Sequence, residues 1–314
     1  MGLISVVIPL YNKGNHIKAT LESVLNQTFQ DFEIIVVNDG STDKSESEVL
    51  KLDSPKIKYF KTENQGVSQA RNFGIEKAQG TLLAFLDADD YWYPHHLEDL
   101  YFLYQQYPEA GFFATNYEFY YSENRIEYPK FLDISSEFKH GIVKDFFKSS
   151  YLYRLTWTSA VAIPKTVIQE IGGFDPNITL GAGEDIDYWI RVALKHKVAF
   201  HNRISARYRM DGENRISHSN TLRRKFAKLD QFQQEEQTNY WLKKYLDLYR
   251  AEFALKFKLA GDKEQFLFYK KALTPSNISL KTRLLLSLPT PLLRGLYRLK
   301  KVLENKGIFV SAYH

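Results

Sequence analysis

The first ninety residues alternate between short apolar runs and longer segments whose apolar residues recur every three or four positions. The apolar runs predict strands buried on both faces, and the longer segments predict amphipathic helices. Ser41 or Thr42, in the polar run after the second predicted strand, is expected to cap a following helix. Strands that alternate with helices at this spacing predict an α/β protein with a parallel, doubly wound sheet. The predicted strands are 3–9, 32–37, 57–60 and 81–86, and the predicted helices are 17–25 and 66–77.

The pattern changes twice further along the chain. Residues 107–165 are irregular and dense in aromatic residues, and they predict a mixture of helix, short strands and loops. A short apolar run at 160–163 precedes a turn, and a helix is expected to begin at Glu184. After about Ser219 the chain consists of long helical stretches rich in Lys, Gln, Leu and Phe, so we place a boundary there. The prediction is a domain of residues 1–218 followed by a helical region of residues 219–314.

Composition and charge narrow the classes of protein. The net charge of +5 is mild, and because nucleic-acid binders concentrate more basic charge, no nucleic-acid partner is expected. The absence of cysteine excludes disulfides, thiolate zinc sites and cysteine nucleophiles, and it fits a reducing compartment. The first residues lack the features of a signal peptide, and no apolar stretch reaches the roughly 18 residues of a membrane span. We therefore expect a cytoplasmic protein that is at most peripheral to a membrane.

An acidic cluster of Asp87, Asp89 and Asp90 directly follows the predicted strand 81–86. Hard divalent cations such as Mn²⁺ or Mg²⁺ prefer oxygen ligands, and a bridging cation would offset the repulsion between these carboxylates and a diphosphate. Acidic loop tips are commonly only solvated. The position at the end of a buried strand, where ligands bind in such sheets, favours a metal site here.

Three further elements carry polar groups suited to chemistry. Asp39 ends the second predicted strand and could accept a hydrogen bond from a base or a ribose, or it could belong to a simple turn. Arg71 follows a glycine-led helix start and could lie beside a nucleotide or on the surface. The acidic run from Glu184 to Asp187 could supply a general base, although acidic residues also favour a first helical turn.

Together these segments resemble the family 2 glycosyltransferases, which are inverting enzymes with the GT-A fold. The resemblance covers roughly residues 3–215 and implies a Rossmann-like, mostly parallel sheet flanked by helices, here with a C-terminal helical extension. It also implies a nucleotide-binding half at 1–106 and an acceptor half at 107–218. It is carried by 5–12 (SVVIPLYN), 36–43 (VVNDGSTD), 64–72 (NQGVSQARN), 86–90 (LDADD) and 183–187 (GEDID).

The resemblance implies a nucleotide site for a sugar donor, most simply a UDP-sugar. Tyr11 would stack on the nucleobase, Asp39 would bond uracil, and Arg71 would lie near the base. Asp87 would contact the ribose. The residues implied to bind the nucleotide are Pro9, Tyr11, Asn12, Asp39, Arg71 and Asp87.

The same resemblance implies a metal site and a catalytic base. Asp89 would contact the metal on the diphosphate, with Asp90 as the alternative ligand in this triple acidic run. Asp185 would deprotonate the acceptor hydroxyl, Glu184 would position the acceptor or the donor, and Asp187 is the competing candidate.

Two departures from the family pattern concern a histidine and processivity. Relatives often carry a histidine after a Tyr-Arg pair that completes the metal site, but here Tyr208-Arg209 is followed by Met210-Asp211. His218 is assigned to that place, with His201 as another candidate. The Gln-x-x-Arg-Trp motif of processive synthases is absent, so we expect one sugar or a few to be added.

The acceptor and the C-terminal region are less defined. The resemblance favours a glycan or lipid-linked acceptor in cell-surface polysaccharide synthesis. Residues 280–306 combine many leucines with basic residues. This pattern predicts either peripheral contact with an anionic membrane or a helix packed on protein. Pro289 and Pro291 are expected to interrupt any single helix there. The competing functions are another nucleotide-dependent transferase, such as a nucleotidyltransferase, and a non-catalytic module that binds nucleotide sugars. Neither a dinucleotide-binding G-x-G-x-x-G turn nor a glycine-rich basic loop follows the first strand.

Overall fold

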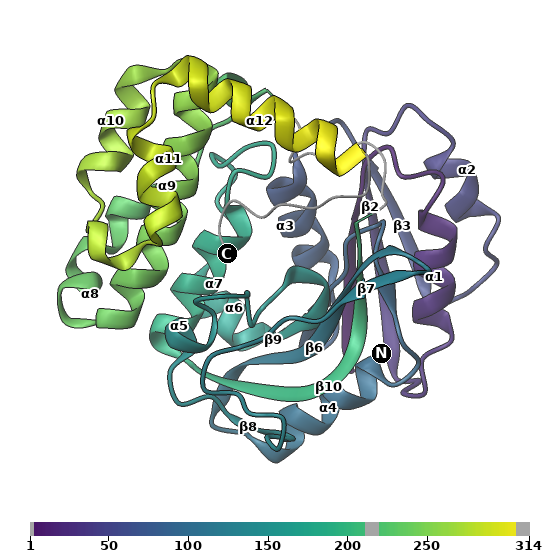
Figure 1. The fold of residues 1–314 in the computed structure, drawn as a ribbon. Coiled ribbons are helices and arrows are strands. Elements are labelled where there is room, and N and C mark those ends of the chain that lie inside the picture. The colour runs from purple at the N-terminus through teal and green to yellow at the C-terminus, as the bar shows by residue number, and fades with distance from the viewer. Residues whose placement is uncertain (1–2, 211–219, 306–314) are drawn as a thin grey trace. The chain divides into compact units, whose positions relative to one another are not determined.

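The computed structural model describes residues 3–210 and 220–305. The chain divides into two compact units, Met1–Ser219 with Lys225–Ala227, and Asn220–Arg224 with Lys228–His314. The first unit contains a sheet with helices on both faces, and the second is helical (Figure 1).

Ten strands of the described chain form one sheet in the order β3-β2-β1-β4-β9-β6-β10-β5, with β7 paired to β6 and β8 paired to β10. Strands β1 to β4 are parallel to one another, as predicted. The other half is mixed, because β9 runs antiparallel to both β4 and β6, whereas β6 and β10 are parallel. The strands are β1 Ile4–Leu10, β2 Phe32–Asp39, β3 Ile57–Thr62, β4 Leu82–Phe85, β5 Tyr91–Trp92, β6 Ala110–Ser122, β7 Arg125–Glu127, β8 His140–Ile142, β9 Val161–Pro164 and β10 Lys197–Arg209.

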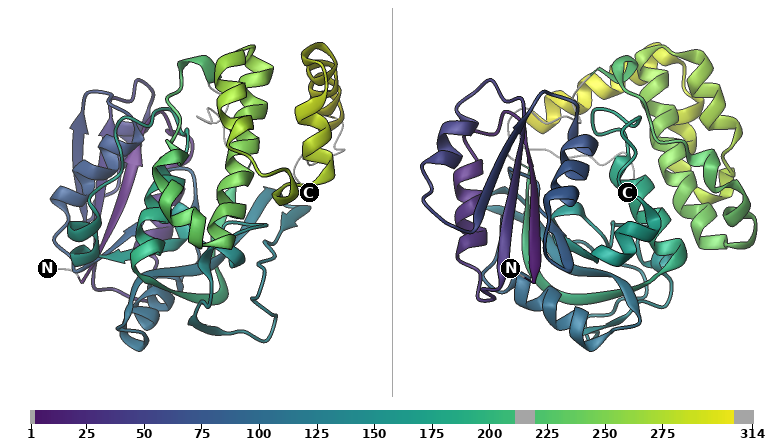
Figure 2. Two further views of the ribbon diagram at one scale, coloured as in Figure 1. Left: turned by 90° about the vertical axis from the view of Figure 1, so that its left-hand side faces the viewer. Right: turned by 180° about the vertical axis from the view of Figure 1, so that it is seen from behind.

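Alternation of side chains along β1 and β2 divides the core between the two faces of the sheet. Ile8 and Val36 belong to the larger core, with residues of α1, α2 and α4, whereas Ile35 and Val37 pack with Ala70 of α3 on the other face. Figures 1 and 2 show α1 and α3 on opposite sides of the sheet. The helices of this unit are α1 Ile17–Leu25, α2 Ser45–Leu50, α3 Val67–Lys77, α4 His96–Gln106, α5 Phe146–Ser149, α6 Lys165–Ile171 and α7 Glu184–Lys195.

Helix α3 approaches β1 closely because Gly74 faces the strand. A Cβ atom at Gly74 would lie 2.4 Å from the Val7 side chain, so only glycine fits without a shift. On the same face, Trp189 of α7 packs edge-on against Phe85 of β4. Helices α3 and α7 therefore share the face of the sheet that carries the candidate site.

Several sequence-based expectations for this unit are confirmed and one is wrong. Helix α1 has the predicted bounds and α7 begins at Glu184, while the apolar run 160–163 lies mostly in β9. The predicted cap at Ser41 or Thr42 is wrong, because α2 begins at Ser45 without a side-chain cap. Ser41 Oγ instead accepts a hydrogen bond from Asn12 N at 3.0 Å and so joins two loops.

The second unit contains α8 Gln233–Thr238, α9 Tyr240–Ala260, α10 Lys263–Lys271, α11 Leu280–Ser287 and α12 Thr290–Asn305. Its buried polar centre is Asp247 of α9, which accepts hydrogen bonds from Lys243 at 2.6 Å and from Asn277 at 2.8 Å. The interruption expected at Pro289 is confirmed, since α11 ends at Ser287 and α12 begins at Thr290, whereas Pro291 lies in the first turn of α12 and does not interrupt it. None of the helices among the described residues is long and apolar enough to cross a membrane.

Candidate active site

The candidate site lies at the reversal of strand order in the parallel half of the sheet. Strand β1 has β2 on one side and β4 on the other, and crevices at the carboxyl ends of strands around such a reversal bind ligands in α/β proteins. Tyr11 to Lys13 follow β1, Asp39 ends β2, and Asp87 to Asp90 follow β4. The topology therefore gathers the predicted residues from three strand ends.

The loop after β1 is held in place by its neighbour after β2. Asn12 has a left-handed backbone with φ of +51°, and its Oδ1 accepts a hydrogen bond from Thr42 N at 2.8 Å. Lys13 N donates to Ser45 Oγ at 2.9 Å, and Gly14 N donates to Asp43 Oδ2 at 2.9 Å. Asn12 thus shapes this loop, and its neighbour Lys13 points its side chain at the acidic turn.

Asp39 is buried and organises the start of α3. Its two carboxylate oxygens each accept a backbone N–H, from Gln65 and from Gly66, both at 2.8 Å. Pro9 pairs with Val37 in the β1–β2 register, so Pro9 and Asp39 lie on one face of the sheet. Tyr11 follows two residues after Pro9 and has 41% of its surface exposed, as a stacking residue requires.

A pocket of about 190 Å³ opens beside Asp39. Its walls include the polar side chains of Thr62, Gln65 and Gln69 and the ring of Phe73. These groups offer hydrogen-bond donors and acceptors beside one aromatic ring.

Arg71 is buried and joins the acidic turn to α7. Its Nη2 donates to Asp87 Oδ1 at 2.8 Å, and its Nη1 donates to Glu184 Oε1 at 3.3 Å. Among the described residues, neither Arg71 Nε nor Glu184 Oε2 has a hydrogen-bond partner. Burial raises the pKa of Glu184, the neighbouring Asp185 adds to this, and Arg71 opposes it. Arg71 therefore pairs with two carboxylates in this structure, and its implied place near the nucleobase stays a prediction.

The other two acids of the turn differ in their surroundings. Asp89 Oδ2 accepts a hydrogen bond from Lys13 Nζ at 2.6 Å, and 18% of its side chain is exposed. Asp90 is buried, and its oxygens accept hydrogen bonds from Ser159 Oγ at 2.6 Å and Arg209 N at 3.1 Å. Burial, with the carboxylates of Asp89 and Asp87, raises the pKa of Asp90 well above its ordinary value. Asp89 is thus the more accessible of the two predicted metal ligands.

The acidic residues in the first turn of α7 differ in how far they are exposed. Gly183 precedes the helix with φ of +101°, a conformation that favours glycine. Asp185 Oδ2 accepts a hydrogen bond from Arg154 Nη1 at 2.9 Å, and 19% of its side chain is exposed. Asp187 is buried and accepts a hydrogen bond from Arg191 Nε at 2.9 Å. Asp185 therefore remains reachable by a substrate, whereas Asp187 belongs to an internal pair.

The carboxylates of the acidic turn fit a metal ion that is bound together with a phosphate group. No three histidine or carboxylate side chains of the described chain are grouped so as to hold a metal ion, and His218 lies outside the described residues. Mg²⁺ is usually bound through one or two carboxylates, substrate phosphates and water. The carboxylates of Asp87 and Asp89, at the end of one strand, suit that arrangement.

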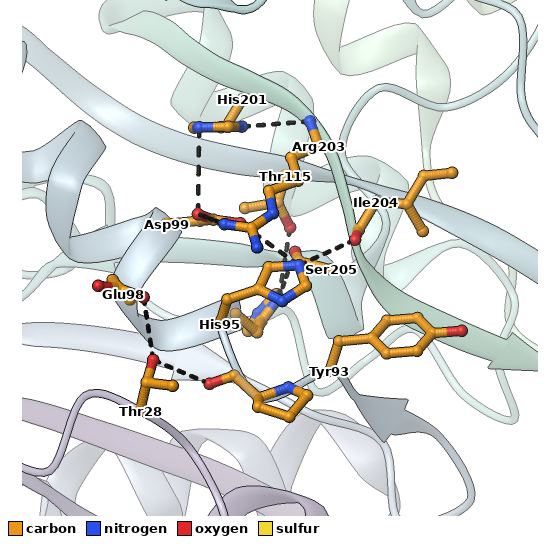
Figure 3. Close-up of polar contacts among 12 residues, drawn as sticks. Thr28, Tyr93, His95, Glu98, Asp99, Thr115, His201, Arg203, Ile204 and Ser205 are labelled. Atoms are coloured by element: carbon orange, nitrogen blue, oxygen red, sulfur yellow. Dashed lines mark hydrogen bonds and ion pairs between the residues drawn. The ribbon is translucent and has the colours of Figure 1, made fainter.

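His201 belongs to a different place in the unit. In the register of β10 with β6, His201 and Arg209 lie opposite Thr115 and Tyr120, which are about 17 Å apart along that strand, and Arg209 N contacts the acidic turn. His201 Nδ1 accepts a hydrogen bond from Arg203 N at 3.1 Å, and its Nε2 lies 4.0 Å from Asp99 Oδ1 (Figure 3). The alternative of His201 as a metal ligand of this turn is therefore wrong.

The cluster around Asp99 predicts opposing effects of pH on stability. Burial raises the pKa of Asp99 to about 6, although the positive charges of Arg203 and His95 act to lower it. The folded protein therefore loses stability as the pH rises from about 4 to 6 and Asp99 ionises. Burial lowers the pKa of His201 to about 4, and the positive charges of His140 and Arg203 lower it further. The folded protein therefore loses stability as the pH falls below about 6.5 and histidine becomes protonated in the unfolded chain.

We expect Asp99→Asn to lose stability more steeply than the wild type between pH about 6.5 and 4, because only the histidine effect remains. Urea unfolding across this range measures it, with the exposed Glu76→Gln as control. Parallel curves for wild type and Asp99→Asn would contradict the opposing effects.

Known proteins resemble this chain in fold and in sequence. Its overall structure resembles TarS residues 1–349 of S. aureus, solved with UDP-GlcNAc, with a TM-score of 0.64 and 18% identity over 99% of this chain and 93% of that one. An uncharacterised glycosyltransferase of Rickettsia bellii is 32% identical over 216 residues, which is 67% of this chain and 29% of that protein. Glycosyltransferase GlyA of Streptococcus pneumoniae is 39% identical over 127 residues, 40% of this chain and 18% of that protein.

The fold is the GT-A fold of nucleotide-sugar transferases, as the resemblance implied. The model of glycosyl transferase family 2 matches residues 5–167, and the chain belongs to that family. The chain spans 29% and 33% of the length of two Rickettsia relatives, so each relative contains long regions that this chain does not match.

Proposed function

We propose that this chain transfers a single sugar from a UDP-sugar to a hydroxyl of a glycan or lipid-linked acceptor, with inversion, in cell-surface polysaccharide synthesis. The observation that carries the proposal is that Asp39, Asp87 and Asp89 stand at the ends of strands on either side of the reversal of strand order. Arg71 also joins Asp87 to Glu184, the neighbour of Asp185 in the chain. The solved complex of TarS with UDP-GlcNAc supports the choice of a uridine donor.

In the proposed reaction the acceptor oxygen forms a bond to the anomeric carbon while the bond to the donor phosphate breaks. Asp185 takes the proton of the acceptor hydroxyl, and the nucleoside diphosphate leaves with the electron pair. Glu184, held by Arg71, fixes the start of α7 and so the place of Asp185. A bound Mn²⁺ or Mg²⁺, held by Asp89 with Asp87 beside it, would offset the charge on the leaving diphosphate.

Nucleotide selectivity tests the donor part of this proposal. Calorimetric titration with Mn²⁺ present should show binding of UDP, with ADP and GDP at least about tenfold weaker, since the wrong base leaves polar groups unpaired. Gln69→Ala, in the pocket beside Asp39, should weaken the binding of UDP and reduce this preference. The control is Glu22→Gln, an exposed position on α1 that does not line the pocket, and it should bind UDP like the wild type. Equal affinity for the three diphosphates would contradict a uridine donor.

The same proposal includes contact of α11 and α12 with an anionic membrane at its inner face. On α12, Leu292, Leu296 and Leu299 recur at helical spacing and are 53%, 42% and 54% exposed. On α11, Leu280 and Leu284 are exposed, and the exposed basic residues Lys281 and Arg283 lie on either side of them. Apolar residues flanked by cations are typical of helices that lie in the interface of an anionic bilayer.

Vesicles containing phosphatidylglycerol test the membrane contact. The double variant Leu292→Ser/Leu299→Ser should bind about tenfold more weakly or worse than the wild type, because each buried leucine contributes about 1.5–3 kcal/mol. The matched control is Leu50→Ser/Leu222→Ser, which removes two exposed leucines elsewhere and should bind like the wild type. Equal sedimentation of both variants, or none for the wild type, would remove this part of the proposal.

A further inference from the structure

The ion pair between Lys13 and Asp89 connects the loop after β1 with the acidic turn after β4. Their Nζ and Oδ2 atoms are 2.6 Å apart, and the side chains are only 12% and 18% exposed. The Lys13 backbone is fixed by its hydrogen bond to Ser45 Oγ and by the neighbouring Asn12–Thr42 contact. Lys13 is therefore a mostly buried cation aimed at a partly exposed carboxylate of the turn.

A divalent cation that binds Asp89 has to compete with this ammonium group. Asp87 already contacts Arg71, so both carboxylates that could receive a cation hold a protein cation in this structure. Displacing Lys13 would leave a largely buried ammonium without this carboxylate, which is unfavourable. A diphosphate arriving at the same crevice would offer its oxygens to Lys13 instead, through charge-assisted hydrogen bonds.

We propose that Lys13 is the counter-ion of Asp89 in the ligand-free protein and that it couples the binding of the divalent cation to the binding of the nucleoside diphosphate. The inference rests on the proposed function, because it needs both ligands at this crevice. When the cation binds alone, it breaks the Lys13–Asp89 ion pair and leaves Lys13 without this partner, which is unfavourable. When the cation and the diphosphate bind together, the cation pairs with Asp89 and the diphosphate pairs with Lys13. By linkage, each ligand then raises the affinity for the other by the same factor. Lys13 is a positioning residue in this scheme.

Mn²⁺ affinity is the direct measure, followed by electron paramagnetic resonance of free Mn²⁺ with and without UDP. In the wild type, UDP should tighten Mn²⁺ binding by about tenfold or more. Lys13→Met should bind Mn²⁺ alone about tenfold more tightly than the wild type, and the factor contributed by UDP should shrink by a similar amount. Lys13→Arg keeps a cation next to Asp89 and should retain most of the coupling.

The matched control is Lys18→Met, which removes the same charge from exposed α1, where Lys18 faces Glu22 at 3.8 Å. It should behave like the wild type, so that a general change of charge does not imitate the effect. The inference is overturned if Lys13→Met binds Mn²⁺ alone no more tightly than the wild type, or if UDP tightens Mn²⁺ binding equally in both. These outcomes leave UDP binding and the proposed function standing. Failure of the wild type to bind UDP with Mn²⁺ present would overturn both.

Discussion

Asp185→Asn is expected to lower kcat by about 10²–10⁴-fold, the range over which a general base contributes to catalysis. The amide cannot take the proton of the acceptor hydroxyl, yet it has nearly the same shape. Since Asp185 does not belong to the nucleotide residues at the strand ends, UDP affinity should stay close to that of the wild type. Steady-state kinetics together with UDP titration measure both effects.

Asp187→Asn is the informative companion, because it makes the same chemical change two residues along α7. Asp187 is buried and paired with Arg191, so its loss should lower the free energy of unfolding while kcat stays within a few-fold of the wild type. If Asp187→Asn loses turnover and Asp185→Asn keeps it, the catalytic base is Asp187 and our assignment is wrong.

Arg71→Met is expected to destabilise the protein by about 3–5 kcal/mol, as the loss of one partner from a buried ion pair does. Arg71 is 3% exposed, and its removal leaves Asp87 and Glu184 without their shared cation. Urea unfolding at neutral pH measures the loss. The expected result is a lower midpoint with an unchanged denaturant slope.

A double variant separates charge from packing in that result. Arg71→Met/Glu184→Gln no longer has the buried carboxylate at position 184. It should therefore recover at least about 1 kcal/mol of the free energy of unfolding that Arg71→Met loses, because an unsatisfied buried polar group costs about that much or more. Glu184→Gln alone keeps Arg71 paired with Asp87 and should be destabilised less than Arg71→Met. A double variant as unstable as Arg71→Met would show that packing, rather than the unpaired carboxylate, causes the loss.

Local patterns were enough to predict most of the strands and helices of the first ninety residues. Runs such as those in β1 and β2 are apolar because both faces of these strands are covered, and the spacing in α1 shows directly which side faces the core. The mixed half was harder, because β6 and β10, each of 13 residues, mix apolar, aromatic and polar residues without a regular alternation and pair in an irregular register. The long β6 strand was predicted only as a mixture of short elements for this reason.

The candidate site was predictable where residues follow strand ends and unpredictable where distant segments meet. Asp39, Asp87 and Asp89 follow from the rule that ligands bind at carboxyl ends of strands. Ser159 was missed, although its Oγ accepts a hydrogen bond from Asp87 N and donates one to Asp90, because nothing near it in sequence marks it. Lys13 stands next to a recognised motif, but only the fold shows that its side chain reaches Asp89, 76 residues away.

The central claim is that this crevice turns over a UDP-sugar with the help of a divalent cation. The most direct measurement is the release of nucleoside diphosphate from a panel of nucleotide sugars with Mn²⁺ or with a chelator, for the wild type and Asp89→Asn. We predict turnover of a UDP-sugar that disappears with the chelator and falls by about 10²-fold or more in Asp89→Asn, in keeping with the loss of a group that stabilises a leaving charge. Turnover that is unaffected by the chelator and by Asp89→Asn, or that occurs only with donors other than UDP-sugars, would contradict the account.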